Sequence, residues 1–448
     1  MTLAPPRPPS SEDLEALIHE ARARQRRRQM ALAAVVALVA GGGLAVWTAV
    51  PGNGRSVVGA SGSRHALARS HQCPPGNLGT IAFVRGGALE LLDLRGCRIR
   101  TVVRSHVAAP IAMSADGRWV GFRRGYVSSR GGPVHRLAGT PVWSPSGHEL
   151  ALVTAHGGVE VGRAGGPLRR LLPDRWGAWT ATFSPGGRFL GVSRTAGHPA
   201  YVEQIWIVDL TTGSKRELFR EPRREGAPLL LQGFSPDGRW LLSWKDLYAS
   251  ASILADGVPL IALPVAGGQP RVVTSELYHD DYVSWCGNRL VYVLNRHGRF
   301  VTQGDGIATA APPSWRATTL LPATGQTSWG AFSCNSGGTL VVAAGPKNED
   351  DPFGHERRSI WLVHGKTASV LPQTRPPRGT SDEWPSWSAE GRWVLFVRTR
   401  FNGKAWPGNL YAADASTGKL AGPIASVGAT ENYYGHYNWT SQISWHRP

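Results

Sequence analysis

The chain has 448 residues, of which 42% are hydrophobic and 18% charged, so it can bury a sizeable core and is not a disordered chain. Its 55 Gly, 33 Pro and 18 Trp make it rich in turns and tryptophan, which argues against a helical bundle. Lysine and arginine number 49 against 31 acidic residues, for a net charge of +18, and almost all of this excess is arginine. On charge alone, a basic chain is a candidate for nucleic-acid binding. Whether this candidate function is reasonable depends on the compartment in which the chain lies.

Residues 1–29 are polar, begin with several prolines and end in a cluster of arginines. They are interpreted as a cytoplasmic tail that contains one short amphipathic helix. The helix is predicted because apolar side chains recur with the spacing i, i+3, i+4, i+7 at Leu14, Leu17, Ile18 and Ala21.

Residues 30–50 carry no charged side chain and are predicted to be a transmembrane helix. At about 1.5 Å per residue, a helix of this length crosses the hydrocarbon core of a bilayer, which is about 30 Å thick. The arginines precede the span, so the positive-inside rule places the N-terminus in the cytoplasm and residues 51–448 outside. A cleaved secretory signal is the alternative, and it exports the same residues.

Export makes a nucleic-acid partner unexpected. The arginine excess is better explained by a solvated surface that faces anionic envelope polymers or lipid head groups, or by a simple compositional bias. Residues 51–72 are rich in Gly and Ser and lack periodicity, so we expect a flexible extracytoplasmic linker there. The remaining residues, 73–448, form the folded part.

The chain contains four cysteines, all of them beyond the predicted span. An even number in an oxidising compartment predicts two disulfides. Of the three possible connectivities we favour Cys73–Cys97, which would pin the start of the domain, and Cys286–Cys334, which would link equivalent positions of neighbouring repeats. Because no C-x-x-C or other metal-type spacing occurs, no metal is expected.

One short pattern recurs along residues 113–445. It consists of a bulky apolar residue, Ser, Pro or Ala, a small or acidic residue, Gly, often Arg, and then an apolar run. Clear copies are centred on Ser114, Ser144, Ser184, Ser235 and Ser388, looser ones on Trp285 and Ser333, and the chain ends on half a copy at Ser444. Pro presets the backbone for a turn, Ser or Asp hydrogen-bonds it, and Gly takes the strained position, so the pattern predicts a strand, a turn and a strand.

The copies are spaced by 30 to 56 residues, and each interval has room for about four short strands. Such periods are typical of propeller blades. Residues 443–445 resemble an innermost strand with nothing after it, and residues 80–84 a second strand with nothing before it. We therefore predict an all-β propeller in which the last strand completes the first blade. Counting this composite blade gives eight four-stranded blades, and seven remains possible because the step from Ser114 to Ser144 is short.

The Ser-Pro-Asp-Gly-Arg pattern resembles the WD-repeat-like blades of the TolB-like propeller family, which also cap prolyl oligopeptidases. The resemblance spans about residues 77–445. It implies a fold and not an activity, because the motif is a turn and does no chemistry. The Gly-x-Ser-x-Gly elbow of an oligopeptidase hydrolase domain is absent from the chain.

The segments that precede the innermost strands are expected to gather around one mouth of the central channel. They are rich in aromatic and acidic side chains, which could stack on sugars or hold a peptide. Several of the aromatics could instead wedge between blades. The candidate ligand-binding residues are Trp176, Trp179, His279, Asp280, Asp281, Tyr282, Trp329, Asp382, Glu383, Trp384, Tyr433, Tyr434, His436 and Tyr437.

The leading hypothesis is a membrane-tethered, extracytoplasmic binding or scaffolding module, without cofactor, for an envelope protein, a peptide or a polysaccharide. The alternative is a propeller enzyme, a glycan lyase or hydrolase, that uses mouth carboxylates with His279 or His436. A sensor that couples the tail to the propeller ranks last, because one helix and a flexible tether transmit conformational change poorly.

Overall fold

The computed structural model describes residues 73–447 apart from short internal segments at 198–200, 223–228, 245–257, 278–281, 295–305, 348–357, 403–404, 431 and 434–435. The predicted tail, span and linker, residues 1–72, therefore lie outside the described residues. Within the described part, no helix has the length and apolar character needed to cross a membrane.

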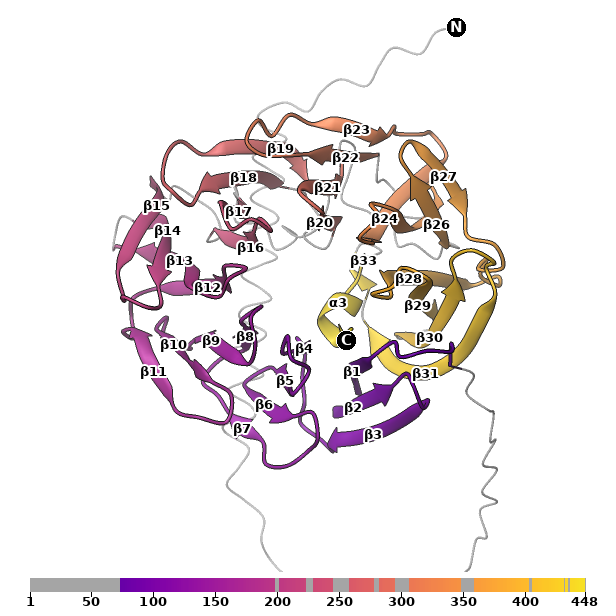
Figure 1. The fold of residues 1–448 in the computed structure, drawn as a ribbon, viewed down its shortest axis with the longest axis horizontal. Helices are drawn as coiled ribbons and strands as arrows, with labels where there is room; N and C mark the ends of the chain where they lie inside the picture. Colours follow the sequence, from indigo (N-terminus) through magenta and orange to yellow (C-terminus); the bar gives the residue numbers. More distant parts are fainter. Residues whose placement is uncertain are drawn as a thin grey trace, which may run out of the picture. The chain divides into compact units, whose positions relative to one another are not determined.

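Eight four-stranded sheets are arranged as a ring around a central channel (Figure 1). This confirms the all-β propeller and decides for eight blades. From the channel outward, blade A consists of β34 (Ile443–His446), β1 (Thr80–Arg85), β2 (Ala88–Asp93) and β3 (Arg98–Val103). Blade B consists of β4 (Ala112–Met113), β5 (Trp119–Phe122), β6 (Gly125–Ser128) and β7 (His135–Arg136). Blade C consists of β8 (Pro141–Trp143), β9 (Glu149–Val153), β10 (Val159–Arg163) and β11 (Leu168–Leu172). Blade D consists of β12 (Ala178–Phe183), β13 (Phe189–Ala196), β14 (Val202–Asp209) and β15 (Lys215–Pro222).

The other four blades follow the same order. Blade E consists of β16 (Leu230–Phe234), β17 (Trp240–Trp244), β18 (Val258–Pro264) and β19 (Arg271–Leu277). Blade F consists of β20 (Val283–Cys286), β21 (Arg289–Val293), β22 (Ile307–Ala310) and β23 (Thr318–Leu321). Blade G consists of β24 (Thr327–Cys334), β25 (Leu340–Pro346), β26 (Ser359–His364) and β27 (Thr367–Val370). Blade H consists of β28 (Thr380–Trp387), β29 (Trp393–Arg400), β30 (Trp406–Asp414) and β31 (Leu420–Thr430). A small hairpin, β32 (Asn432–Tyr433) and β33 (His436–Tyr437), and one short helix, α3 (Trp439–Gln442), lead into β34.

The two ends of the propeller share blade A. Strand β34 pairs antiparallel with β1, with Ile443 opposite Phe83 and His446 opposite Thr80. The indole of Trp445 adds a hydrogen bond of 2.7 Å to the carbonyl oxygen of Leu78. The prediction that the C-terminal strand completes the first blade is confirmed.

The short interval between Ser114 and Ser144 is explained by the size of blade B. Its strands contain only two to four residues each, so four of them fit where the other blades use strands of up to eleven. Blade B therefore has the same four strands as the other blades, but its strands are shorter.

The recurring motif forms the turn between the first and second strands of a blade. In blade B, the Ser114 hydroxyl donates to Asp116 at 2.6 Å and accepts from the backbone N–H of Trp119 at 3.0 Å. Asp116 in turn accepts from the N–H of Arg118, and Gly117 has a φ of 67°, where a side chain would be strained. Buried Ser hydroxyls at the equivalent positions of other blades show that the turn chemistry read from the sequence is correct.

The arginine that follows the motif glycine has a partner that the sequence did not suggest. Arg188 and Arg392 reach across their blades to Asp209 and Asp414, at 2.7 and 2.9 Å. Each aspartate begins the turn between the third and fourth strands and also accepts hydrogen bonds from backbone N–H groups of that turn. One ion pair thus joins the two turns at the same end of a blade.

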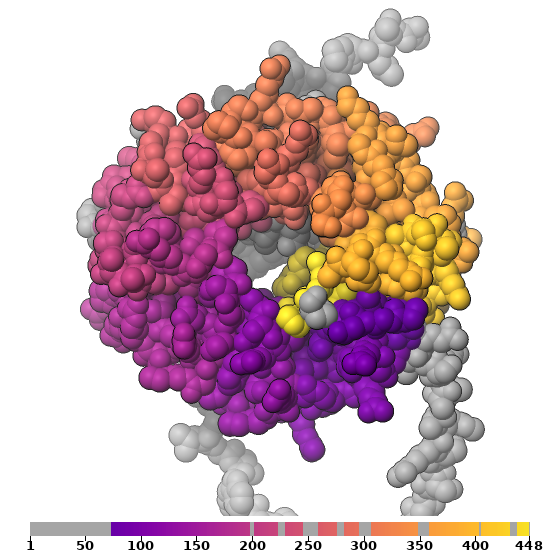
Figure 2. All heavy atoms as spheres, viewed as in Figure 1, coloured from indigo at the N-terminus to yellow at the C-terminus, as the bar shows by residue number. Residues whose placement is uncertain are grey.

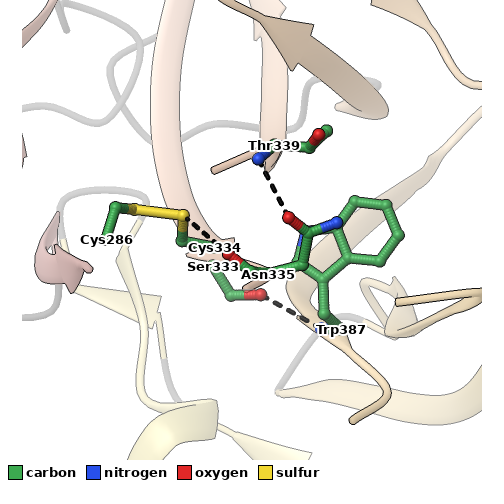
Figure 3. Close-up of a disulfide and its surroundings, with 6 residues drawn as sticks. All are labelled: Cys286, Ser333, Cys334, Asn335, Thr339 and Trp387. Carbon is green, nitrogen blue, oxygen red and sulfur yellow. Dashed lines mark hydrogen bonds between the residues drawn. A yellow bond between two sulfur atoms is a disulfide. The ribbon is translucent and has the colours of Figure 1, made fainter. Parts of the chain in front are cut away.

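Neighbouring blades are joined by apolar packing, side-chain hydrogen bonds and one disulfide. Cys286 of β20 and Cys334 of β24 are bonded, so the innermost strands of blades F and G are covalently linked (Figure 3). The Ser333 hydroxyl accepts the backbone N–H of Trp387 in blade H at 3.1 Å. The second disulfide, Cys73–Cys97, ties the segment before β1 to blade A, and both predicted pairings are therefore confirmed.

The Asp414 turn predicts a pH-dependent contribution to stability. Hydrogen bonds from Ser416 and Arg392 hold the pKa of Asp414 well below its usual range, against the opposing effect of burial. Because the folded pKa is depressed, the stabilisation is complete above the unfolded pKa of about 3.9 and is lost as the pH falls below it. We expect Asp414→Asn to lower the free energy of unfolding by about 1–2 kcal/mol at pH 7 and by progressively less toward pH 2.

Denaturant unfolding between pH 2 and pH 8 measures this difference. Asp93→Asn is the matched control, because Asp93 begins the equivalent turn of blade A, where its carboxylate accepts the backbone N–H of Arg95 at 3.0 Å. A difference between Asp414→Asn and the parent protein that stays constant over this pH range would contradict the prediction.

Candidate functional site

The predicted mouth lies at the end of the blades opposite the Ser-Gly turns, where the innermost strands begin and the second strands end. Four innermost strands carry a bulge there, in blades D, E, G and H. A bulge adds a residue to one strand and re-aims its side chain. The extra residues are Trp179, Gln232, Gly330 with Ala331, and Trp384 with Pro385.

Trp179 is the most exposed aromatic side chain of the described mouth, with 53% of its surface accessible. Its indole N–H donates to the Thr195 hydroxyl at 2.7 Å, and that hydroxyl donates to the buried carboxylate of Glu203 at 2.9 Å. The ring is therefore held in one orientation while half of its surface faces solvent. Since its N–H is already bonded, the ring offers a flat apolar face.

Trp179 lines a cavity of about 900 Å³ that extends over blades B to E. The space-filling view shows an opening at the centre of the ring of blades (Figure 2). The cavity is bordered by the exposed side chains of Arg123, Arg124, His156 and Tyr201. None of the described residues that line it is acidic.

The wall of this cavity is built by close backbone approaches at glycine. A Cβ at Gly177 would clash with the carbonyl oxygen of Thr195, and one at Gly139 would clash with that of Val153. The Thr195 N–H also donates to the Gly177 carbonyl at 3.0 Å, so the cavity wall and the strand that anchors Trp179 are one hydrogen-bonded unit.

The two described acidic candidates are buried in blade H. Asp382 accepts two hydrogen bonds from Arg398, at 2.7 and 2.9 Å, and is fully buried. Glu383 accepts from Arg358 of blade G at 3.0 Å and from the Ser381 hydroxyl at 2.6 Å, and Arg358 and Glu383 are both less than 5% exposed. Each of these carboxylates is therefore matched by its own arginine.

Burial controls the ionisation of both groups. It raises the pKa of Asp382 to about 7 although Arg398 favours the charged form, and it also raises the pKa of Glu383 against the effect of Arg358. With no access from the cavity, these two carboxyls serve as inter-strand and inter-blade contacts and are not positioned to act on a glycosidic bond.

The remaining described candidates are mostly packed. Trp176 is half-buried between Trp206 and Arg194, whose guanidinium carbon lies 4.2 Å from the centre of the Trp176 ring. Trp329 is buried against Trp361, with ring centres 5.7 Å apart, and Tyr282 is also buried. None of these three side chains is among the described residues that line the cavity.

Trp384 and Tyr437 are partly buried on blade H and the segment before β34. Trp384 is held in the bulge at a φ of 54°, which is unusual for a bulky residue. The guanidinium of Arg358 lies over the Tyr437 ring at 5.9 Å. Burial raises the pKa of the Tyr437 phenol.

Other candidates cannot be placed. His279, Asp280, Asp281 and Tyr434 lie outside the described residues, and the side chains of Tyr433 and His436 in the β32–β33 hairpin do as well. The structure thus brings Trp179 alone, among the described candidates, into the cavity. Across the described ranges, no group of three or more His, Cys, Asp or Glu side chains could hold a metal ion.

Sequence reasoning missed Arg123, Arg124, His156 and Tyr201. The arginines form the two-residue turn between β5 and β6, and His156 lies in the turn between β9 and β10. The sequence prediction confined the mouth to the segments before the innermost strands. In a propeller, the turns between the second and third strands reach the same end, so their composition was a usable signal.

Comparison with known proteins leaves the family open. No protein-family model matches the chain, and no curated protein matches it. Among solved structures, one described as the eukaryotic initiation factor is 12% identical, with 84% of this chain and 89% of that one covered and a TM-score of 0.51. An identity this low shows the shared fold alone.

Two other propellers are also similar. Oligogalacturonate lyase from Vibrio parahaemolyticus is 13% identical over 76% of this chain and 98% of that chain, with a TM-score of 0.45. TolB from Acinetobacter baumannii is 14% identical over 84% and 68%, with a TM-score of 0.36. Neither likeness carries an inference about activity.

The Gly177 backbone approach makes a testable prediction about the cavity. We expect Gly177→Ala to lower the free energy of unfolding by about 2 kcal/mol or more, because its φ of 88° and the contact with Thr195 both oppose a Cβ. Gly213→Ala is the matched control: its φ is 73°, but no atom lies within 4 Å of the place that its Cβ would occupy, so about 1 kcal/mol is expected.

Thermal and denaturant unfolding of the two variants measure the contribution of the close approach. If Gly177→Ala were no more destabilising than Gly213→Ala, the close packing of the cavity wall would be disproved.

Proposed function

We propose that this protein is a non-enzymatic binding or scaffolding module that holds an envelope protein, a peptide or a polymer at the mouth of its propeller. In this proposal, residues 30–50 anchor the chain in the membrane and the propeller lies outside the cytoplasm. The observation that carries the proposal is the open cavity of about 900 Å³ with the fixed, half-exposed ring of Trp179 in its wall.

Its size and composition support a binding role. Ligand sites commonly enclose about 300–1,000 Å³ and combine aromatic surface with a few polar groups. Trp179 and Tyr201 supply the aromatic surface, at 53% and 43% exposure, while Arg123 and Arg124 supply charge. A large aromatic ring that is held rigid loses little conformational entropy when a ligand covers it.

The hydrolase form of the enzyme alternative has no support from the described residues. A retaining or inverting glycosidase needs two accessible carboxyl groups on either side of the bond that it cleaves. Asp382 and Glu383 are buried and bonded to Arg398 and Arg358, and no described residue that lines the cavity is acidic.

A cross-linking pull-down from native membranes tests the proposal with the full-length protein. The parent protein is compared with Trp179→Ala/Tyr201→Ala, which should lose at least tenfold of the captured partner because the aromatic contact surface is removed. Val272→Ala is the control, because Val272 is 65% exposed on β19, an outermost strand.

Circular dichroism and thermal unfolding establish that each variant is folded. Capture that depends on Trp179 and Tyr201 but not on Val272 would support a binding module at the mouth. Equal capture by all three proteins, or capture by none of them, would overturn the proposal.

A further inference from the structure

We propose that the cavity recognises an acidic sugar chain, with Arg123 and Arg124 binding its carboxylates and Trp179 stacking on a sugar ring. This inference rests on the proposed binding function and specifies its ligand.

The charged side chains among the described residues of the cavity are all basic. Arg123 and Arg124 form the whole of a two-residue turn, and both side chains are exposed. No described carboxylate pairs with either guanidinium, whereas Arg188, Arg358, Arg392 and Arg398 all have an acidic partner. A planar guanidinium binds a carboxylate through two parallel hydrogen bonds, so two adjacent arginines suit a chain with repeated acidic groups.

The backbone of this turn is fixed, which gives the arginines a defined place. The N–H of Arg123 donates to the Ala108 carbonyl and the N–H of Leu137 donates to the Arg124 carbonyl, both at 3.0 Å. Arg124 is held at a φ of 63°, a conformation that is uncommon for residues other than glycine. Strain of this kind persists only where the surroundings enforce it.

The hydrogen bond of the Trp179 indole favours a ligand whose own ring presents C–H groups to it. The indole N–H is used by Thr195, so a ligand meets only the apolar face of the ring. A sugar ring has C–H groups on one face and polar groups around its edge, and it can therefore stack on the indole while its acidic substituents reach the arginines.

The wall around Trp179 is made largely of small residues, which disfavours a peptide. Gly139, Ala155, Gly157 and Ala181 line it, and such small residues leave no deep pocket between large apolar side chains. Peptide recognition depends on such pockets or on addition to a strand edge. A single-stranded nucleic acid also combines stacking with negative charge, and it is kept as an outcome of the test.

The experiment measures the affinity of defined probes for the full-length protein in neutral lipid nanodiscs by calorimetry. The probes are a mannuronic acid hexasaccharide, the same hexasaccharide with its carboxyl groups reduced, hexaglutamate, and a thymidylate hexanucleotide. We expect the acidic hexasaccharide to bind best, its carboxyl-reduced form to bind at least tenfold more weakly, and its affinity to fall with added salt.

Two variants test the assigned side chains. Arg123→Gln/Arg124→Gln should weaken binding of the acidic hexasaccharide by at least tenfold. Its control, Arg95→Gln/Arg316→Gln, removes the same charge from two exposed residues in turns between third and fourth strands, at the other end of the blades, and should leave the affinity unchanged. Trp179→Ala should weaken binding about tenfold, and Trp179→Phe should restore most of it.

The outcomes separate this inference from the proposed function. Equal affinity for the acidic and reduced sugars, tighter binding of hexaglutamate or the oligonucleotide, or no binding of any probe would overturn the sugar assignment. If the membrane pull-down still depended on Trp179 and Tyr201 in those cases, the binding module would stand with another ligand. If the pull-down were independent of both residues, the binding function would fail as well.

Discussion

The pairing of β34 with β1 is the constraint on which the whole propeller depends. Without it, blade A would lack its innermost strand and β1 would present an unpaired edge to the channel. The same strand also reaches blade B, where the Ser444 hydroxyl accepts the N–H of Met113 at 3.0 Å. One short strand therefore completes blade A and also closes the ring of blades. The side chains of the mouth keep their relative positions because this ring is closed.

The sequence predicted the architecture well because the repeated signal is local. Ser, Gly and the residues between them specify a turn through contacts within five residues, as between Ser114 and Trp119, so the pattern survives in the sequence even where the strands vary. The pairing of Cys286 with Cys334 could also be expected, since both occupy the same place in consecutive repeats. The partner of Arg392 could not, because Asp414 is 22 residues away and the contact depends on how the third strand returns.

The mouth was harder to predict, because exposure there depends on packing between blades. Trp176, Trp179, Trp329 and Trp384 look alike in the sequence, each close to the start of an innermost strand. Trp329 packs against Trp361, whereas the bulge at Trp179 turns its ring into the cavity. A bulge is a register shift between two strands, and neither strand alone specifies it.

The described arginines of the mouth are of two kinds, those that pair with a carboxylate and those that have no described acidic partner. On blades G and H, Arg358 is buried and Arg398 partly buried, and they pair with Glu383 and Asp382, so their charges serve the fold. On blade B, Arg123 faces a cavity in which no described lining residue is acidic, and its charge stabilises no described contact. The repulsion between two exposed neighbouring arginines is weak in water, and an anionic ligand would relieve it. These arginines, and the ring of Trp179 that Thr195 and Glu203 orient, therefore support the proposal of an anion-bearing ligand.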